Sequence, residues 1–204
     1  MLQGLTAHYL STSTYPVQEG DWALVHAAAG GVGLLLTQMV KLRGGRVLAT
    51  TSTEEKAELA RYAGADEVTS YEGFAAHARE LTDGEGFPVV YDGVGAATFD
   101  ESLDALRPRG YMVLYGQSSG PVPPIDLQIL NSHGSLFVTR PSLAHYILDR
   151  DELLERTSDL FAWITQGKLS LRIDSTFPLE KAGEAHTRLE SRASSGKILL
   201  TTQA

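Results

Sequence analysis

Glycine residues cluster in the stretch HAAAGGVG, which begins at His26 and ends at Gly33. Its spacing, Ala28-x-Gly30-x-x-Gly33, places alanine where the strict GxGxxG pattern has its first glycine. Ordering glycine costs more backbone entropy than ordering any other residue, so a glycine cluster indicates that something approaches the backbone closely. Between a strand and a helix, such a turn predicts a pyrophosphate site, because the helix amino terminus offers unpaired N–H groups and a positive dipole. Gly30 and Gly31 would admit the anion, and Gly33 would let the helix pack tightly against the strand.

The end of the next predicted strand indicates which dinucleotide is bound. An NAD site usually has an acidic residue about twenty positions beyond the glycines, where it bonds the ribose 2′-hydroxyl. Here the strand ends in Ala49-Thr50-Thr51-Ser52, without a carboxylate, and Lys56 follows one helical turn later. Hydroxyl groups and a cation suit a 2′-phosphate, so this stretch favours NADPH, with Glu54 and Glu55 as a counter-signal unless they point to solvent. The alternatives are a tight turn without a ligand and an ordinary exposed Lys56.

The residue types give little support for a metal site, a catalytic nucleophile or a catalytic acid or base. The six histidines are scattered without an HExxH motif, and the chain has no cysteine, which removes thiolate nucleophiles and cysteine-ligated zinc. Ser118-Ser119 and Ser194-Ser195 lack the GxSxG surroundings of a nucleophile and are interpreted as loop residues. Asp92, in VVYDGVG, is interpreted as a structural hydrogen-bond acceptor at a strand end, with a catalytic base as the alternative. We therefore expect no metal site and no obligatory catalytic acid or base.

Alternating apolar runs and helical patterns predict the elements that position these residues. Short apolar runs bounded by turn residues indicate buried strands, and apolar residues at helical spacing indicate the helices between them. The predicted strands are Trp22–Ala27, Arg46–Ser52, Asp66–Tyr71, Pro88–Gly95, Gly110–Gly116 and Gly134–Pro141, and the helices are Gly33–Arg43, Glu54–Ala63, Phe74–Gly84 and Ala97–Pro108. Helices between successive strands imply βαβ crossovers, so we predict an α/β fold with a doubly wound, parallel, six-stranded Rossmann sheet.

The last third of the chain departs from this alternation. The stretch from Arg150 to Leu169 has the pattern of a long amphipathic helix, with one apolar side formed by Leu153, Leu154, Leu160, Phe161 and Ile164. An extended segment, a second helix over 178–192 and a terminal strand over 196–201 follow. We expect a dinucleotide-binding domain over residues 1–142 and a carboxy-terminal α/β extension over residues 143–204.

Charge and composition narrow the possible partners. The formal net charge is −8 and no cluster of lysine or arginine stands out, which argues against nucleic acid or an anionic membrane as the main partner. The amino terminus lacks the pattern of a signal peptide, and the longest apolar run, GVGLLLTQMV, is too short to cross a bilayer. Together with the absence of cysteine, these features favour a cytoplasmic location.

Five stretches together resemble a known family: GLTAHYL, HAAAGGVG, VVYDGVG, GSLFVTRPSL and LESR. The chain resembles the NADPH:quinone oxidoreductases of the zinc-independent medium-chain dehydrogenase/reductase superfamily, the group that includes zeta-crystallin. The resemblance is collinear from Leu2 to nearly the carboxyl end, and it implies hydride transfer from NADPH to a bound quinone. The alternatives are an enoyl or alkenal reductase, which would reduce an activated C=C bond, and a catalytically silent NADPH-binding protein.

The resemblance also implies which residues bind the cofactor. The pyrophosphate turn is formed by Ala29, Gly30, Gly31, Val32 and Gly33. Lys56, Tyr71 and Arg192 match positions that hold the adenosine 2′-phosphate, beside the Ser52 hydroxyl of the predicted strand end. The nicotinamide half of the cleft is lined by Thr6, Asp92, Gly93, Val94, Tyr115, Gly116, Ser118, Val138 and Thr139.

Two further expectations follow from the resemblance. Family members begin with a GroES-like domain that carries much of the quinone pocket and on which the carboxy-terminal segment normally packs, and this chain starts almost at the linker after it. We therefore expect this chain alone to bind NADPH but to reduce quinones poorly. The alternating stretch GSLFVTR lies at the outer position of the predicted sheet, where an uncovered apolar strand is a liability unless it is paired. In relatives this strand meets its twin, so we expect a homodimer through Ser135–Arg140.

Overall fold

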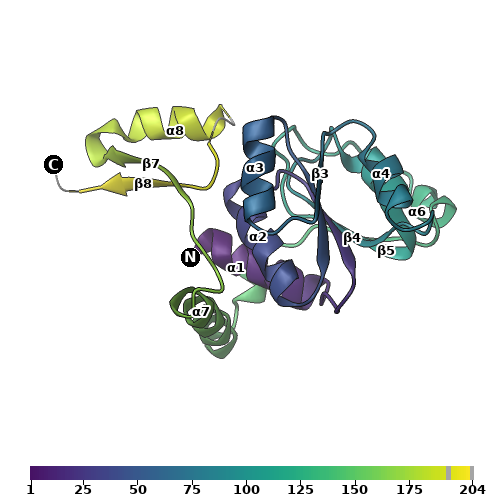
Figure 1. The fold of residues 1–204 in the computed structure, drawn as a ribbon, viewed down its shortest axis with the longest axis horizontal. Coiled ribbons are helices and arrows are strands. Elements are labelled where there is room, and N and C mark those ends of the chain that lie inside the picture. Colours follow the sequence, from purple (N-terminus) through teal and green to yellow (C-terminus); the bar gives the residue numbers. More distant parts are fainter. Residues whose placement is uncertain (192–193, 203–204) are drawn as a thin grey trace.

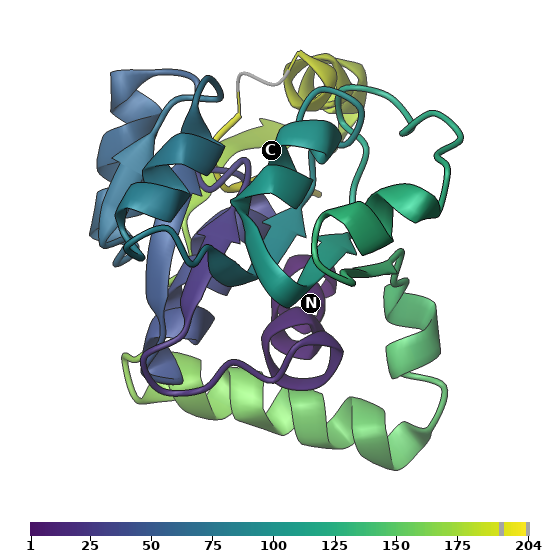
Figure 2. The same cartoon turned by 90° about the vertical axis from the view of Figure 1, so that its right-hand side faces the viewer.

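The computed structural model of the chain describes residues 1–191 and 194–202. Six strands form one sheet in the order β3-β2-β1-β4-β5-β6, and every neighbouring pair is parallel (Figures 1 and 2). The strands are β1 (Trp22–Val25), β2 (Arg46–Thr50), β3 (Glu67–Thr69), β4 (Phe87–Asp92), β5 (Leu106–Leu114) and β6 (Phe137–Thr139). The predicted six-stranded parallel sheet is therefore confirmed.

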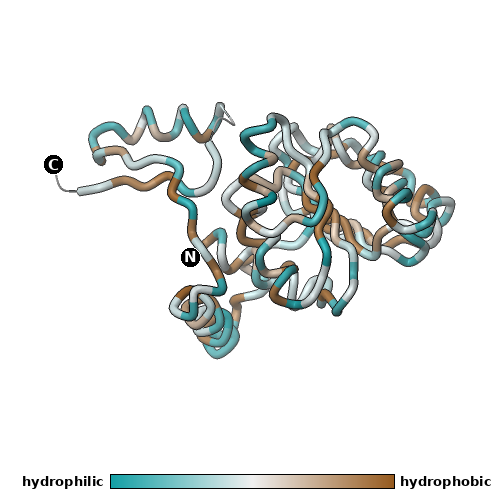
Figure 3. Tube along the Cα trace, in the orientation of Figure 1, coloured by the Kyte–Doolittle hydropathy of each residue, from teal (hydrophilic) through white to brown (hydrophobic). Residues whose placement is uncertain are grey.

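Helices cover both faces of this sheet. Successive strand residues point to opposite faces, so in β1 the side chains of Ala23 and Val25 join one core and Leu24 joins the other. The first core is closed by α1 (Leu2–Tyr9), α2 (Gly31–Leu42) and Ala60 of α3 (Glu54–Tyr62), and the second by α4 (Phe74–Glu80), α5 (Phe99–Ala105) and α6 (Gln128–Ser132). Burial on both sides explains why the strands are nearly continuous apolar runs, which are brown at the centre of Figure 3.

The strand order reverses at the middle of the sheet, between β1 and β4. β1 pairs with β2 on one side and with β4 on the other. Chain segments that leave the carboxyl ends of two such strands turn in opposite directions and leave a crevice between them, where open α/β sheets bind ligands. The glycine turn after β1 and the loop that follows Asp92 of β4 both lie at this edge of the sheet.

The chain begins with a helical segment that has no counterpart in the sequence-based prediction. α1 continues into a π-helical turn, η1 (Leu10–Thr14), and packs against both α2 and α7 (Arg150–Thr165). Figure 2 shows α7 running across the bottom of the molecule, below this segment. Tyr9 and Leu10 are fully buried there, so the segment is part of the first core.

Several predicted boundaries are wrong for identifiable reasons. The helix predicted to reach Pro108 ends at Ala105, because β5 begins at Leu106, which already pairs with Phe87 of β4. Pro108 lies in the register shift that follows this pair, a position where a strand tolerates proline. β1 ends at Val25 because Ala27 adopts a φ of 50° and begins the turn. Neither α6 nor the 3-10 helix η2 (Leu143–Tyr146) was predicted.

The apolar side predicted for α7 is also only partly correct. Leu160 is buried and Leu153 and Ile164 pack against the first core, but Leu154 and Phe161 are 48% and 54% exposed. In an α-helix each residue is rotated by about 100° from the one before it, so Leu154 and Phe161 fall outside the contacting stripe.

A small α/β unit ends the chain, as the sequence predicted. It consists of β7 (Ile173–Pro178), η3 (Leu179–Lys181), α8 (Ala182–Glu190) and β8 (Lys197–Thr201). β7 and β8 form their own parallel two-stranded sheet, which lies beside the main sheet at the left of Figure 1. Within the described part of the chain, no helix combines the length and the apolar character needed to cross a membrane.

Candidate functional site

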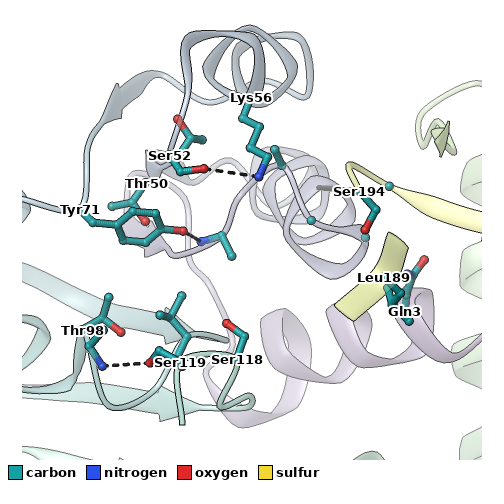
Figure 4. Close-up of a pocket in the computed structure, with 18 residues that line it drawn as sticks. Gln3, Thr50, Ser52, Lys56, Tyr71, Thr98, Ser118, Ser119, Leu189 and Ser194 are labelled. Carbon is teal, nitrogen blue, oxygen red and sulfur yellow. Dashed lines mark hydrogen bonds between the residues drawn. The ribbon is translucent and has the colours of Figure 1, made fainter. Parts of the chain in front are cut away.

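The turn between β1 and α2 is held by backbone hydrogen bonds. The N–H of Gly30 donates to the carbonyl oxygen of Ala27 at 2.8 Å, and that of Ala28 donates to the carbonyl oxygen of Thr50 at 3.2 Å. The N–H of Ala27 donates to the Tyr71 hydroxyl at 3.1 Å (Figure 4). The turn is thereby tied to the ends of the two neighbouring strands, β2 and β3.

The glycines of this turn are crowded in different ways. A Cβ on Gly33 would lie 2.5 Å from the Ala27 carbonyl oxygen and 2.7 Å from the Ala28 Cα, so α2 could not approach the turn as closely. A Cβ on Gly30 would lie 3.1 Å from the Ala27 carbonyl oxygen. A Cβ on Gly31 would contact only the side chain of Gln3. Close packing therefore requires glycine at position 33, and the surface of the turn is left free of side chains at 30 and 31.

The amino terminus of α2 is open to an anion. Its N-cap is Gly30, which has no side chain with which to cap the helix. The amino termini of α3 and α7 are instead capped by the side chains of Thr53 and Asp149. Uncapped N–H groups in the first turn, together with the helix dipole, favour a phosphate at α2.

A pocket of about 550 Å³ lies directly over this turn (Figure 4). Its wall combines the glycine turn, the ends of β2 and β3, the loops after β4 and β5, the first turn of α1 and the carboxy-terminal unit. The lining residues are Gln3, Ala27, Ala29, Gly30, Gly31, Thr50, Thr51, Ser52, Lys56, Tyr71, Val94, Ala97, Thr98, Ser118, Ser119, Leu189, Ser194 and Gly196. Lys56 is the one charged residue in this set, so the pocket favours an anionic ligand.

Hydroxyl groups and a lysine meet at the end of β2. The Lys56 Nζ donates to the Ser52 Oγ at 3.4 Å (Figure 4). Neither of the two neighbouring carboxylates lines the pocket: Glu54 is exposed and pairs with Arg61 at 2.5 Å, and Glu55 is exposed on the same helix. The polar groups that face the pocket here are therefore suited to a phosphate.

The loop after β4 is organised by a buried carboxylate. Asp92 accepts hydrogen bonds from the N–H groups of Val94 at 2.6 Å and Gly95 at 3.1 Å, and from the Thr98 hydroxyl at 2.7 Å. Burial raises the pKa of Asp92, although these three donors oppose the shift. Asp92 itself does not line the pocket, but Val94 and Thr98 do. Asp92 therefore fixes the positions of two residues of the pocket wall.

A buried histidine connects the two sides of the pocket. His26 is fully buried, with its Nδ1 2.8 Å from the Thr50 Oγ1 and its Nε2 2.9 Å from the Ser102 Oγ. Ser102 uses its one hydroxyl proton to donate to the Thr98 carbonyl oxygen at 2.7 Å. The Ser102 oxygen therefore accepts from a protonated Nε2, and Nδ1 accepts from Thr50. Burial lowers the pKa of His26 to about 3, so the imidazole is neutral near pH 7.

Only some of the residues predicted to bind the cofactor line the pocket. Ala29, Gly30, Gly31, Ser52, Lys56, Tyr71, Val94 and Ser118 line the pocket. The following residues do not line it: Val32 and Gly33 in the first turn of α2, Asp92 at the end of β4, and Gly93, Tyr115 and Gly116 in the loops after β4 and β5. The backbones of Gly93 and Gly116 are so close that a Cβ on Gly116 would lie 2.6 Å from the Gly93 carbonyl oxygen. Arg192 lies outside the described residues.

Three predicted residues lie apart from the pocket. The Thr6 hydroxyl donates within α1 to the Leu2 carbonyl oxygen at 2.8 Å. Val138 and Thr139 lie in β6, paired with Met112 and Val113 of β5. These positions belong to the side of the crevice predicted for the nicotinamide.

The sequence-based prediction missed other pocket residues. The sequence pattern indicates Thr50 and Thr51 only as hydroxyl groups at a strand end and Ser119 only as a loop residue, and it gives no sign of Ala97 or Thr98. Ser194 is likewise predicted only as a loop residue. Gln3, Leu189 and Gly196 carry no local sequence signal, because they reach the pocket from the two ends of the chain. Among residues 1–191 and 194–202, no group of three or more histidine, aspartate or glutamate side chains lies together in a way that could hold a metal ion.

Comparison with known proteins identifies relatives of this chain. The family described as zinc-binding dehydrogenase matches residues 31–163. The 2-haloacrylate reductase of a Burkholderia species is 44% identical over 207 residues, which cover 100% of this chain and 62% of that protein.

Two solved structures are similar over almost the whole chain. The Escherichia coli quinone oxidoreductase in complex with NADPH has a TM-score of 0.95 at 45% identity, and the match covers 98% of this chain and 63% of that one. A mycobacterial protein in complex with NADPH has a TM-score of 0.95 at 49% identity, with 98% and 64% covered. This chain thus spans less than two thirds of the length of these relatives. Since the family match covers more than half of its residues, the chain belongs to the zinc-binding dehydrogenase family.

Proposed function

We propose that this chain binds NADPH and forms the cofactor-binding part of a quinone oxidoreductase. The observation that carries the proposal is the pocket itself, in which an uncapped helix amino terminus and the Ser52–Lys56 pair face the same cavity. NADPH carries two anionic groups that a binding site must accommodate, a pyrophosphate and a 2′-phosphate. The pocket offers one suitable set of donors for each. Two similar proteins have been solved with NADPH bound, which supports the same assignment.

Different residues of this chain would bind different groups of NADPH. The first turn of α2, with Gly30 and Gly31, would receive the pyrophosphate. Ser52, Lys56 and Tyr71 would hold the 2′-phosphate, together with Arg192 by family resemblance. Bound NADPH supplies a hydride from its nicotinamide ring, and the protein orients that ring and excludes water around it. We assign no acid, base or zinc ligand to this chain, which has no cysteine.

The acceptor that we propose is a quinone, and one observation favours a second candidate. The 44% identity to a 2-haloacrylate reductase supports an acceptor with an activated C=C bond. Both reactions use the same hydride donor, and they differ in the group that receives the hydride. The cofactor site described above serves either acceptor.

A pair of assays tests the proposal. Oxidation of NADPH is followed by absorbance with a benzoquinone and with an enone, for the chain alone and for the chain fused to the amino-terminal domain of the Escherichia coli relative. We expect NADPH binding by the chain alone, slow turnover of either acceptor, and faster turnover of the quinone by the fusion. Binding without turnover in the fusion would favour the non-catalytic alternative. Equal turnover by the chain alone would contradict our expectation that it reduces quinones poorly.

Three finer features belong to the same proposal. A homodimer through Ser135–Arg140 is supported by the edge position of β6 and by Phe137, which is 51% exposed and stacks on Tyr111. A cytoplasmic location is supported by the absence of cysteine. The division into residues 1–142 and 143–204 rests on the change of pattern near Leu143. Sedimentation analysis, cell fractionation and limited proteolysis test these three features in turn.

A further inference from the structure

The side chain of Gln3 lies across the glycine turn, although it comes from a different element. Gln3 is in the first turn of α1, and with Gly31 it lines the pocket over the amino terminus of α2 (Figure 4). A Cβ on Gly31 would lie 2.5 Å from the Gln3 Cδ and 2.9 Å from its Oε1. The amide therefore rests directly on the backbone of the first residue of α2.

The chemistry of this amide matches its position. An amide carries two N–H donors and is uncharged. Within residues 1–191 and 194–202, the Gln3 amide makes no hydrogen bond to another protein group. Gly30 and Gly31 at the amino terminus of α2 line the same pocket, and among residues 1–191 and 194–202 no carboxylate lines it to compete for these donors. An anion at the helix terminus would thus be met by donors from two directions.

We propose that the Gln3 amide donates a hydrogen bond to the pyrophosphate of NADPH, an inference that rests on the proposed function. The amino-terminal helix is then part of the cofactor site and contributes a donor beside the first residue of α2. Helix α1 is held in this position by its packing against α2 and α7. The position of Gln3 therefore depends in part on α7, which is remote in the sequence from the glycine turn.

Two substitutions separate the hydrogen bond from the shape of the side chain. Gln3→Met keeps the length and helix propensity of the side chain but removes its donors. We expect it to weaken NADPH binding about tenfold, the size typical of one hydrogen bond to a charged group. Gln3→Glu places a carboxylate beside the pyrophosphate, and we expect a loss of about a hundredfold that shrinks with added salt. Gln18→Met is the matched control, because Gln18 is exposed in the loop before β1, away from the pocket.

A second ligand distinguishes a direct contact from a structural effect. Adenosine 2′-phosphate contains the 2′-phosphate but no pyrophosphate, so its affinity, measured by NMR titration, is expected to be the same in wild type and Gln3→Met. An equal loss for both ligands would overturn the proposal, as would unchanged or tighter NADPH binding by Gln3→Met. If the wild-type chain bound neither ligand, the proposed function would fail instead. Wild-type binding with unaltered variants would refute only the role of Gln3.

Discussion

Gly31 and Gly33 are two residues apart in the same helix turn, and replacing each by alanine should have a different consequence: a loss of stability at Gly33 and a loss of NADPH affinity at Gly31. In Gly33→Ala the new Cβ would lie 2.5 Å from the Ala27 carbonyl oxygen and 2.7 Å from the Ala28 Cα. Carbon contacts normally lie at about 3.5–4.0 Å, so the start of α2 must move by about 1 Å. Overpacking costs about 1–3 kcal/mol, and because the new Cβ meets backbone atoms that cannot rotate away, we take the upper part of this range, about 2–3 kcal/mol. Alanine gains about 1 kcal/mol over glycine in a helix. We expect a net loss of about 1–2 kcal/mol.

Gly31→Ala has a different neighbour and should have a different effect. Its Cβ meets only atoms of the Gln3 side chain, which can rotate away. We therefore expect a change in stability of less than about 0.5 kcal/mol, as for most exposed substitutions. The methyl group would nevertheless project into the pocket at the helix terminus. We expect NADPH affinity to fall more than about tenfold, the effect of losing one good contact to a charged group.

Thermal unfolding and NADPH fluorescence titration measure the two effects separately. For a chain of this size, a loss of 1–2 kcal/mol corresponds to a fall in Tm of about 2–8 °C. Gly183→Ala is the control, because Gly183 lies in α8 and a Cβ there would meet nothing within 4 Å. The reasoning is refuted if Gly33→Ala is as stable as wild type, or if Gly31→Ala binds NADPH normally.

Three further predictions concern the rest of the molecule. The pKa of His26 is lowered to about 3 in the folded state and is about 6.5 when unfolded, so protons stabilise the unfolded chain as the pH falls below 6.5. Between pH 7 and pH 5 His26 should cost about 2 kcal/mol of stability, and urea unfolding of His26→Gln should show a flatter pH profile; an unchanged profile would contradict the assignment. Arg156 is buried and donates to the Tyr146 carbonyl oxygen and the Ser13 hydroxyl, both at 3.0 Å. Arg156→Met should therefore lose about 2–4 kcal/mol in the same assay without changing NADPH affinity, and a stable variant would show that these contacts contribute little. Phe137→Lys should convert the proposed dimer to a monomer in sedimentation experiments, because it places a charge on the edge strand; persistence of the dimer would require another interface.

Local patterns in the sequence were sufficient to predict the sheet. Each strand is a short apolar run between turn residues, and burial on both faces makes such runs easy to recognise. The glycine turn was predictable for the same reason, since Gly30, Gly31 and Gly33 follow β1 directly. Lys56 could be placed because it lies one helical turn beyond the end of β2.

The remaining pocket residues could not be predicted because they depend on contacts between distant segments. Gln3 reaches the pocket only because α1 packs on α2 and α7, and Leu189 only because the carboxy-terminal unit lies beside the turn. The buried Arg156 was missed for a related reason. A charged residue on a helix is normally exposed, and several partners of Arg156, among them Ser13, lie in the amino-terminal helical segment.

The most direct test of the account is a calorimetric titration of this chain with NADPH and with NADH. The account predicts that NADPH binds at least about tenfold more tightly, because Lys56 and Ser52 contribute a charge-assisted contact to the 2′-phosphate that NADH lacks. Lys56→Ala should remove most of this preference, whereas Lys181→Ala, which replaces an exposed lysine beside α8, should retain it. Equal affinities for the two nucleotides, or a preference that survives Lys56→Ala, would contradict the assignment of the pocket to NADPH.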